Sequence, residues 1–212
     1  MKTDTPQTVY LKDYTPPTFW VDSVDLDFAI TGGGTTVSAT LVMRRNTARP
    51  GQPLVLDGEE LQTLSVSVDG QDWPYSETPG TLTLVDLPDT FTLRTVVRID
   101  PDKNTRLSGL YRSKDGYFTQ CEAQGFRRIT WFLDRPDVMA TYTVTLHADQ
   151  ATYPVLLANG NPVAAGEEAD GRHWAKWQDP FKKPAYLFAV VAGKLDVLRD
   201  TYKTASGREV QL

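Results

Sequence analysis

The sequence is poor in the residues that build disulfide bonds and metal sites. Cys121 is the one cysteine among 212 residues, so no intrachain disulfide can form, as is usual in a reducing compartment. The two histidines, His147 and His173, lie too far apart for a zinc site built on a helical histidine pair. These shortages favour a cytoplasmic protein and predict no metal site within this chain.

Long apolar runs and an excess of basic residues are also missing. The longest apolar stretch, near Tyr186–Gly193, is far shorter than the roughly 20 residues that a membrane helix needs. The N-terminal segment MKTDTPQTVY lacks the apolar region of a signal peptide. With 22 Lys and Arg against 27 Asp and Glu, the net charge is −5, which lacks the basic footprint of a nucleic-acid binder. We therefore expect neither a membrane nor a nucleic acid as a partner.

The apolar residues that are present recur at every second position in many short runs. The apolar faces are Val24, Leu26, Phe28 and Ile30; Val37, Ala39, Leu41 and Met43; Leu64, Val66 and Val68; Phe91, Leu93, Val97 and Ile99; and Tyr142, Val144, Leu146 and Ala148. This alternation is typical of half-buried strands, and Asp69-Gly70 and Gly32-Gly33-Gly34 indicate hairpin loops. The one helical signal is a single turn starting at Asp134-Arg135-Pro136. We predict a mostly β domain, with curved antiparallel sheets or a sandwich and little helix.

The segment Phe118–Phe126 (FTQCEAQGF) carries the strongest functional signal. In an extended conformation, Gln120, Glu122 and Gln124 would share one face between two aromatic rings, with small side chains opposite. An ionised carboxylate between two amides can bind a primary ammonium and a peptide backbone. The alternative is an ordinary solvated strand face, and Gly125 could break the alternation.

The other candidates have simpler structural interpretations. Arg127, Arg128 and the nearby Asp134 favour ion pairs that orient a loop, with a phosphate site as the sharper alternative. The two histidines are expected to be exposed or hydrogen-bonded side chains, and no signature of a nucleophilic enzyme is present. Core packing is favoured for three tryptophans that could otherwise form a sugar-stacking surface, Trp131, Trp174 and Trp177.

A series of separated motifs adds a family resemblance to these patterns. In chain order the motifs are GLYRS (Gly109–Ser113), TQCEAQGFRR (Thr119–Arg128), LDRPDVMA (Leu133–Ala140), LLANGN (Leu156–Asn161) and WQDPFKKPAYLFAVVAG (Trp177–Gly193). Together they resemble the N-terminal domain of bacterial aminopeptidase N, a zinc metallopeptidase of the gluzincin type. The resemblance extends from Tyr14 to the end of the sequence.

The resemblance implies a fold, a domain boundary and a cofactor. Residues 1–194 would form a saddle-like, mostly antiparallel β domain that covers one side of a thermolysin-like catalytic domain. Residues 195–212, with a turn at Ser206-Gly207, would be the first strand region of that otherwise absent domain. The family's G-x-M-E-N and H-E-x-x-H motifs do not occur in this sequence. Zinc is thus implied for the parent enzyme, bound by the catalytic domain, and none for this chain.

The resemblance also assigns roles to two residues of the polar segment. Glu122 would help to hold the free α-ammonium of a peptide substrate, and Gln120 would line the pocket near the first substrate residue. No catalytic or metal-binding residue is implied here, so the parent would be an aminopeptidase and this chain alone would be inactive. Its partners would be the remaining domains of its own chain and peptide substrates. The alternative function is a stand-alone β-sandwich module that binds peptides or carbohydrate.

Overall fold

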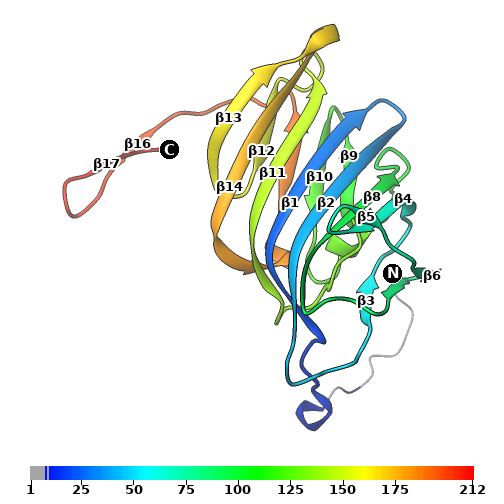
Figure 1. Cartoon of the computed structure of the whole chain (residues 1–212). Helices are drawn as coiled ribbons and strands as arrows, with labels where there is room; N and C mark the ends of the chain where they lie inside the picture. Colours follow the sequence, from blue (N-terminus) through cyan, green and yellow to red (C-terminus); the bar gives the residue numbers. More distant parts are fainter. Residues whose placement is uncertain (1–7, 9) are drawn as a thin grey trace.

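The structure, a computed structural model, describes residue 8 and residues 10–212, and strands dominate that part of the chain (Figure 1). Within these described residues, seventeen strands form four sheets. The described residues contain no α-helix, only four 3₁₀ turns: η1 (Leu11–Asp13), η2 (Phe126–Arg128), η3 (Ala169–Gly171) and η4 (Ala185–Leu187). The prediction of a mostly β domain with little helix is confirmed.

The largest sheet has eight strands and provides the framework of the domain. In spatial order they are β13 (Asn161–Glu167), β14 (Arg172–Pro184), β11 (Met139–Asp149), β1 (Phe19–Thr31), β2 (Gly34–Arg45), β8 (Thr90–Ile99), β4 (Gln62–Val68) and β5 (Gln71–Asp72). All neighbours are antiparallel except β1 and β11, which run parallel with Val24 opposite Tyr142. Figure 1 shows these strands as a curved layer.

Three smaller sheets complete the fold. A four-stranded sheet contains β12 (Val155–Ala158), β15 (Val190–Gly193), β10 (Gly116–Gln120) and β9 (Gly109–Ser113), a three-stranded sheet contains β3 (Leu54–Asp57), β7 (Thr81–Leu84) and β6 (Ser76–Thr78), and a hairpin contains β16 (Thr201–Lys203) and β17 (Glu209–Gln211). In Figure 1 the four-stranded sheet lies behind the large one. The core joins these layers, and Phe28 of β1 stacks on Phe188, just before β15, with ring centroids 6.2 Å apart.

The predicted alternation corresponds closely to the buried faces of the strands. Every apolar residue named in those runs is buried except Leu64, which is 51% exposed. A β-bulge between Thr63 and Ser65 shifts the register of β4 against β8, and this shift turns Leu64 away from the core while Val66 and Val68 remain inside. Two-residue alternation cannot anticipate a bulge, so the prediction for Leu64 was wrong.

The two predicted hairpin loops are present in the structure, but the predicted helical turn is not. Asp69 and Gly70 join β4 to β5 with φ values of 50° and 81°, and Gly32 and Gly33 join β1 to β2. The helical turn predicted at Asp134-Arg135-Pro136 is instead a hydrogen-bonded turn in which Val138 N donates to Arg135 O at 3.2 Å. The ion pair between Arg135 and Asp137, at 2.7 Å, stabilises that turn without any helix following it.

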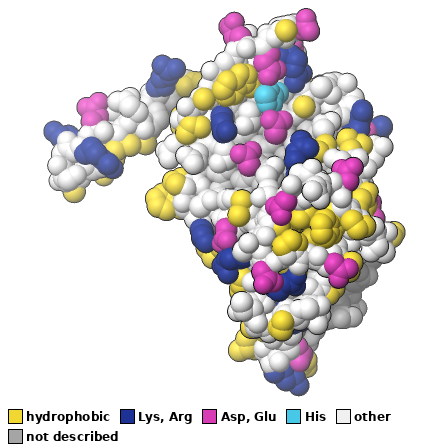
Figure 2. All heavy atoms as spheres, in the orientation of Figure 1, with side chains coloured by type: hydrophobic (Ala, Val, Ile, Leu, Met, Phe, Trp, Pro, Cys, Tyr) yellow, Lys and Arg dark blue, Asp and Glu magenta, His cyan; other side chains and the backbone are white. Residues whose placement is uncertain are grey.

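The C-terminal hairpin is separate from the other sheets. After β15 ends at Gly193, residues 194–200 have no regular structure, and β16 and β17 then pair with each other around the turn at Ser206-Gly207. Figure 1 shows this hairpin extending away from the β layers, and in the space-filling view of Figure 2 it projects from the body of the domain. Val197 and Leu198 of the connecting segment are exposed. A boundary near residue 194 remains a prediction, and this arrangement agrees with it.

Candidate functional site

The predicted recognition segment is a turn, not an extended strand. Strand β10 ends at Gln120, residues 122–125 form a turn, and η2 begins at Phe126. Gln120, Glu122 and Gln124 are exposed, as expected, but Phe126 is fully buried, so the strip is not bracketed by two exposed rings. The polar character of the segment was predicted correctly, and its extended conformation was wrong.

Glycine makes the tight turn possible. Gly125 N donates a hydrogen bond of 2.7 Å to Cys121 O, which closes the turn around Glu122. A Cβ atom at position 125 would lie 2.3 Å from Gln120 O and 2.9 Å from Cys121 Cα, distances that a real Cβ does not reach. The backbone therefore approaches itself at Gly125 more closely than any other residue type permits. This close approach ends the strand and presents Glu122 at its edge.

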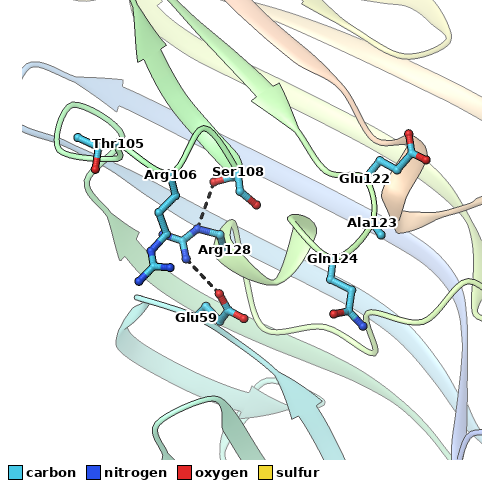
Figure 3. Close-up of a pocket in the computed structure, with 8 residues that line it drawn as sticks. All are labelled: Glu59, Thr105, Arg106, Ser108, Glu122, Ala123, Gln124 and Arg128. Atoms are coloured by element: carbon cyan, nitrogen blue, oxygen red, sulfur yellow. Dashed lines mark hydrogen bonds and ion pairs between the residues drawn. The ribbon is translucent and has the colours of Figure 1, made fainter. Parts of the chain in front are cut away.

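An open pocket of about 490 Å³ lies at this turn (Figure 3). Its lining residues are Glu59, Thr105, Arg106, Ser108, Glu122, Ala123, Gln124 and Arg128. In Figure 3 the Glu122 carboxylate points away from the Arg128–Glu59 ion pair. Of the two predicted substrate-binding residues, Glu122 lines the pocket, and Gln120 donates from Nε2 to Glu122 O at 3.3 Å. The structure thus brings Gln120 and Glu122 together, with the amide supporting the backbone that carries the carboxylate.

Arg127 holds the far side of the turn through ion pairs. Its Nε and its backbone N both donate to Asp134 Oδ2, at 2.9 and 3.2 Å, and its guanidinium lies 3.5 Å from Asp57. Burial raises the pKa of Asp134, whose side chain is 2% exposed, while the Arg127 contact acts in the opposite direction. The prediction of loop-orienting ion pairs is confirmed. The guanidinium of Arg127 is already paired with the carboxylates of Asp134 and Asp57, which argues against a phosphate site.

Arg128 binds three acceptors from two other segments of the chain. Its side chain is 5% exposed, and it donates to Glu59 Oε2 at 3.0 Å, to Ser108 O at 3.2 Å and to Glu60 Oε2. Arg106 also binds Glu60, at 3.1 Å. Glu59, Glu60 and the 105–108 segment were not predicted from the sequence. The only signal in the sequence was the complementary charge of Glu59-Glu60 and Arg127-Arg128. These two pairs lie about seventy positions apart, and sequence alone does not show that they meet.

The remaining candidates have structural roles. His147 contacts Glu168 at 2.5 Å and Asp27 at 3.1 Å, and His173 contacts Tyr153 O at 2.8 Å. Both histidines are therefore hydrogen-bonded side chains, as predicted. Trp131 is buried and donates to Thr63 Oγ1 at 2.8 Å, which supports core packing over a sugar-stacking role.

Cys121 is expected to be unreactive in the folded protein. Its side chain is buried, and burial raises the pKa of its thiol to about 12, so the nucleophilic thiolate is scarce near neutral pH. Iodoacetamide at mildly alkaline pH should leave Cys121 unmodified in the native protein and alkylate it fully in guanidinium, as measured by intact-mass spectrometry. Rapid alkylation of the native protein would contradict the burial of this side chain.

The fold and the site define a β-rich domain with an exposed carboxylate at a pocket. Across residue 8 and residues 10–212, no cluster of three or more His, Cys, Asp or Glu side chains is suited to hold a metal ion. None of the helical segments in the same part of the chain has the length and hydrophobicity that a membrane-spanning helix needs. Residues 22–187 match the family described as the peptidase M1 N-terminal domain. The chain belongs to this family.

Individual relatives agree with this assignment. Aminopeptidase N of Caulobacter vibrioides is 51% identical over 215 residues, covering 100% of this chain and 25% of that protein. Aminopeptidase N of Escherichia coli is 49% identical over 211 residues, covering 99% of this chain and 24% of that protein. The chain therefore spans about a quarter of the length of these relatives.

Solved structures show the same fold. Legionella pneumophila aminopeptidase A, solved in complex with aspartic acid, has a TM-score of 0.90 and 34% identity, covering 95% of this chain and 24% of that one. An M1 zinc metallopeptidase from Deinococcus radiodurans has a TM-score of 0.76, with 92% of this chain and 46% of that chain covered. At 20% identity, this second similarity shows the fold alone.

Proposed function

We propose that this chain is the N-terminal domain of a zinc-dependent aminopeptidase, and that Glu122 recognises the free α-ammonium of the peptide substrate. The observation that carries the proposal is the position of the Glu122 carboxylate, exposed at the rim of a pocket. Among the residues that the structure describes, no ion pair uses this carboxylate, whereas the neighbouring Arg127 and Arg128 each pair with two carboxylates. It is free to accept charge-assisted hydrogen bonds from an ammonium group.

The chemistry of an exopeptidase explains why such a carboxylate is needed. Cleavage after the first residue requires the α-ammonium to sit one residue from the scissile carbonyl, and errors of about 1 Å in such a placement can cost about 100-fold in rate. Glu122 would supply the anionic contact, and Gln120, which supports the backbone of the turn, would lie near the first substrate residue. The domain thereby caps one side of the active site and limits access of water.

Zinc would be held by the remaining domains of the longer chain. The described residues of this chain contain no suitable ligand cluster, so they do not fit the metal. In the catalytic domain, zinc would polarise the scissile carbonyl and activate water. The role of this domain is confined to binding and orienting the substrate.

The full-length enzyme tests this function with two matched peptides. A peptide with a free N-terminus should lose its first residue, its N-acetylated counterpart should remain intact, and a zinc chelator should abolish the release, all followed by mass spectrometry. The 212-residue chain alone should release no amino acid. Equal hydrolysis of the acetylated peptide, or activity of the isolated chain, would contradict the proposal.

The alternative of a stand-alone binding module is not favoured. The chain matches aminopeptidases N over 99% and 100% of its length, and residues 22–187 match the peptidase M1 N-terminal domain. We infer that its partners are the remaining domains of its own chain together with peptide substrates, and that the enzyme works in the cytoplasm. The single cysteine, buried and unpaired, supports that compartment.

A further inference from the structure

We propose that Arg128 is a positioning residue for α-ammonium recognition, because it holds the Glu122 turn in the orientation that presents the carboxylate. This inference rests on the proposed function and deepens it, since it concerns how the same site is held. Arg128 does not touch the substrate in this scheme. It acts through the backbone of residues 122–125.

Each of the three nitrogens of the Arg128 guanidinium donates a hydrogen bond. Its three nitrogens reach three separate points: Nε to Ser108 O at 3.2 Å, one terminal nitrogen to Glu59 Oε2 at 3.0 Å, and the other to Glu60 Oε2. These partners come from the loop after β3 and from the residue before β9. A planar guanidinium can join three acceptors in fixed directions, whereas a lysine ammonium offers a single charged centre. Figure 3 shows the Arg128 side chain between Ser108 and Glu59.

Arg128 is also hydrogen-bonded to the turn itself. Arg128 N donates to Gly125 O at 3.1 Å, so the residue binds the last carbonyl of the turn directly. A Cβ atom on Gly109 would lie 2.7 Å from Arg128 Cβ, and one on Gly125 would lie 3.0 Å from Gly109 N. Gly109, Gly125 and Arg128 are therefore packed with no spare space. Movement of Arg128 displaces the turn that carries Glu122.

The ion pairs of Arg128 join one buried cation to two carboxylates that are about half exposed. Glu59 and Glu60 are about half exposed, with side-chain exposures of 48% and 59%, while Arg128 is 5% exposed. The guanidinium is thus the fixed centre, and the carboxylates approach it from the solvent side. Glu59 N also donates to Arg127 O at 2.9 Å, so the acidic loop binds the backbone of η2 as well. Arg127 and Arg128, which directly follow the turn and Phe126, are thus both held against the same loop.

A double-mutant cycle in the full-length enzyme tests the inference. The variants are Arg128→Lys, Glu122→Gln and their combination, and the probes are L-leucine and 4-methylpentanoate, which differ by the α-amine. Arg128→Lys should raise the inhibition constant of L-leucine by about fivefold or more and change that of 4-methylpentanoate by less than about twofold. In the Glu122→Gln background, Arg128→Lys should change the L-leucine constant by less than about twofold, because residues that act as a unit are not additive.

Matched variants control for folding and charge. Arg44→Lys alters an ion pair on an exposed part of the large sheet, where Arg44 lies 3.1 Å from Asp22, and it should leave both constants unchanged. If Arg128→Lys does not fold, Glu60→Gln weakens the same contact with an exposed, isosteric replacement. A simple electrostatic effect of Glu60→Gln on the ammonium would persist in the Glu122→Gln background, whereas a positioning effect would disappear.

The possible failures are distinguishable. Equal shifts for both probes, or an Arg128→Lys effect on L-leucine that persists without the Glu122 carboxylate, would overturn the positioning role alone. A full effect of Glu122→Gln with no effect of Arg128→Lys would also overturn it alone. If Glu122→Gln leaves the inhibition constant of L-leucine unchanged, the proposed role of Glu122 fails, and the positioning role fails with it.

Discussion

Replacing Glu122 with glutamine in the full-length enzyme should lower kcat/KM for peptides with a free N-terminus by about 10- to 150-fold. Loss of a hydrogen bond to a charged group costs about 1.5–3 kcal/mol, and each 1.4 kcal/mol corresponds to a factor of about ten. Glutamine keeps the size of the side chain and removes the charge. Because Glu122 is exposed and lies outside the buried core, stability should hardly change. Steady-state kinetics and a thermal melt measure the two effects separately.

The matched control is Glu167→Gln, an exposed carboxylate at the end of β13. It changes the net charge of the chain by the same amount and should leave kcat/KM within about twofold, since exposed charges far from a site interact weakly through water. Equal activity of the Glu122→Gln variant and this control would contradict the assigned role of Glu122.

The largest expected effect on stability comes from Phe126→Ala. Phe126 is fully buried, and its ring packs edge-on against Phe132 at 4.9 Å and Phe188 at 5.1 Å. Removing a buried aromatic ring costs about 3–5 kcal/mol through lost burial and the cavity left behind. Phe126 also begins η2, so the cavity opens directly beneath the arginines that hold the Glu122 turn. Hydrogen exchange of peptides covering β10 and η2 should therefore accelerate by more than about 100-fold.

Leu64→Ala provides the control for this stability effect. Leu64 lies on β4 and is 51% exposed because of the β-bulge, so its truncation should cost less than about 0.5 kcal/mol. A similar acceleration of exchange in both variants would contradict the claim that burial of Phe126 stabilises the core more than the exposed Leu64 does.

The fold was largely predictable because burial on one face of a strand leaves a two-residue period in the sequence. Val24, Leu26, Phe28 and Ile30 show that period and are all buried in β1. Where local backbone geometry intervenes, the period misleads, as the β-bulge at Leu64 shows. The parallel pairing of β1 with β11 had no local signal, because it joins residues more than one hundred positions apart.

The candidate site was predictable in its chemistry and not in its shape. The side chains in TQCEAQGFRR predict a carboxylate with neighbouring amides, and Gly125 indicates a possible break in the alternation. The turn itself depends on the approach of Gly125 to Gln120 O, and on the loop at Glu59 and Glu60 that arrives from a distant part of the chain. Contacts of that kind arise only from the packed tertiary structure.

The most direct test of the central claim is the distance from the Glu122 carboxylate to the ammonium nitrogen of a bound amino acid in a crystal structure of the full-length enzyme. A charge-assisted hydrogen bond between these groups places the nitrogen and an oxygen about 2.7–2.9 Å apart. We expect that distance in a complex with an amino-acid product. An ammonium group bound by other residues, with Glu122 beyond about 4 Å, would contradict the role of this domain in recognising the substrate N-terminus.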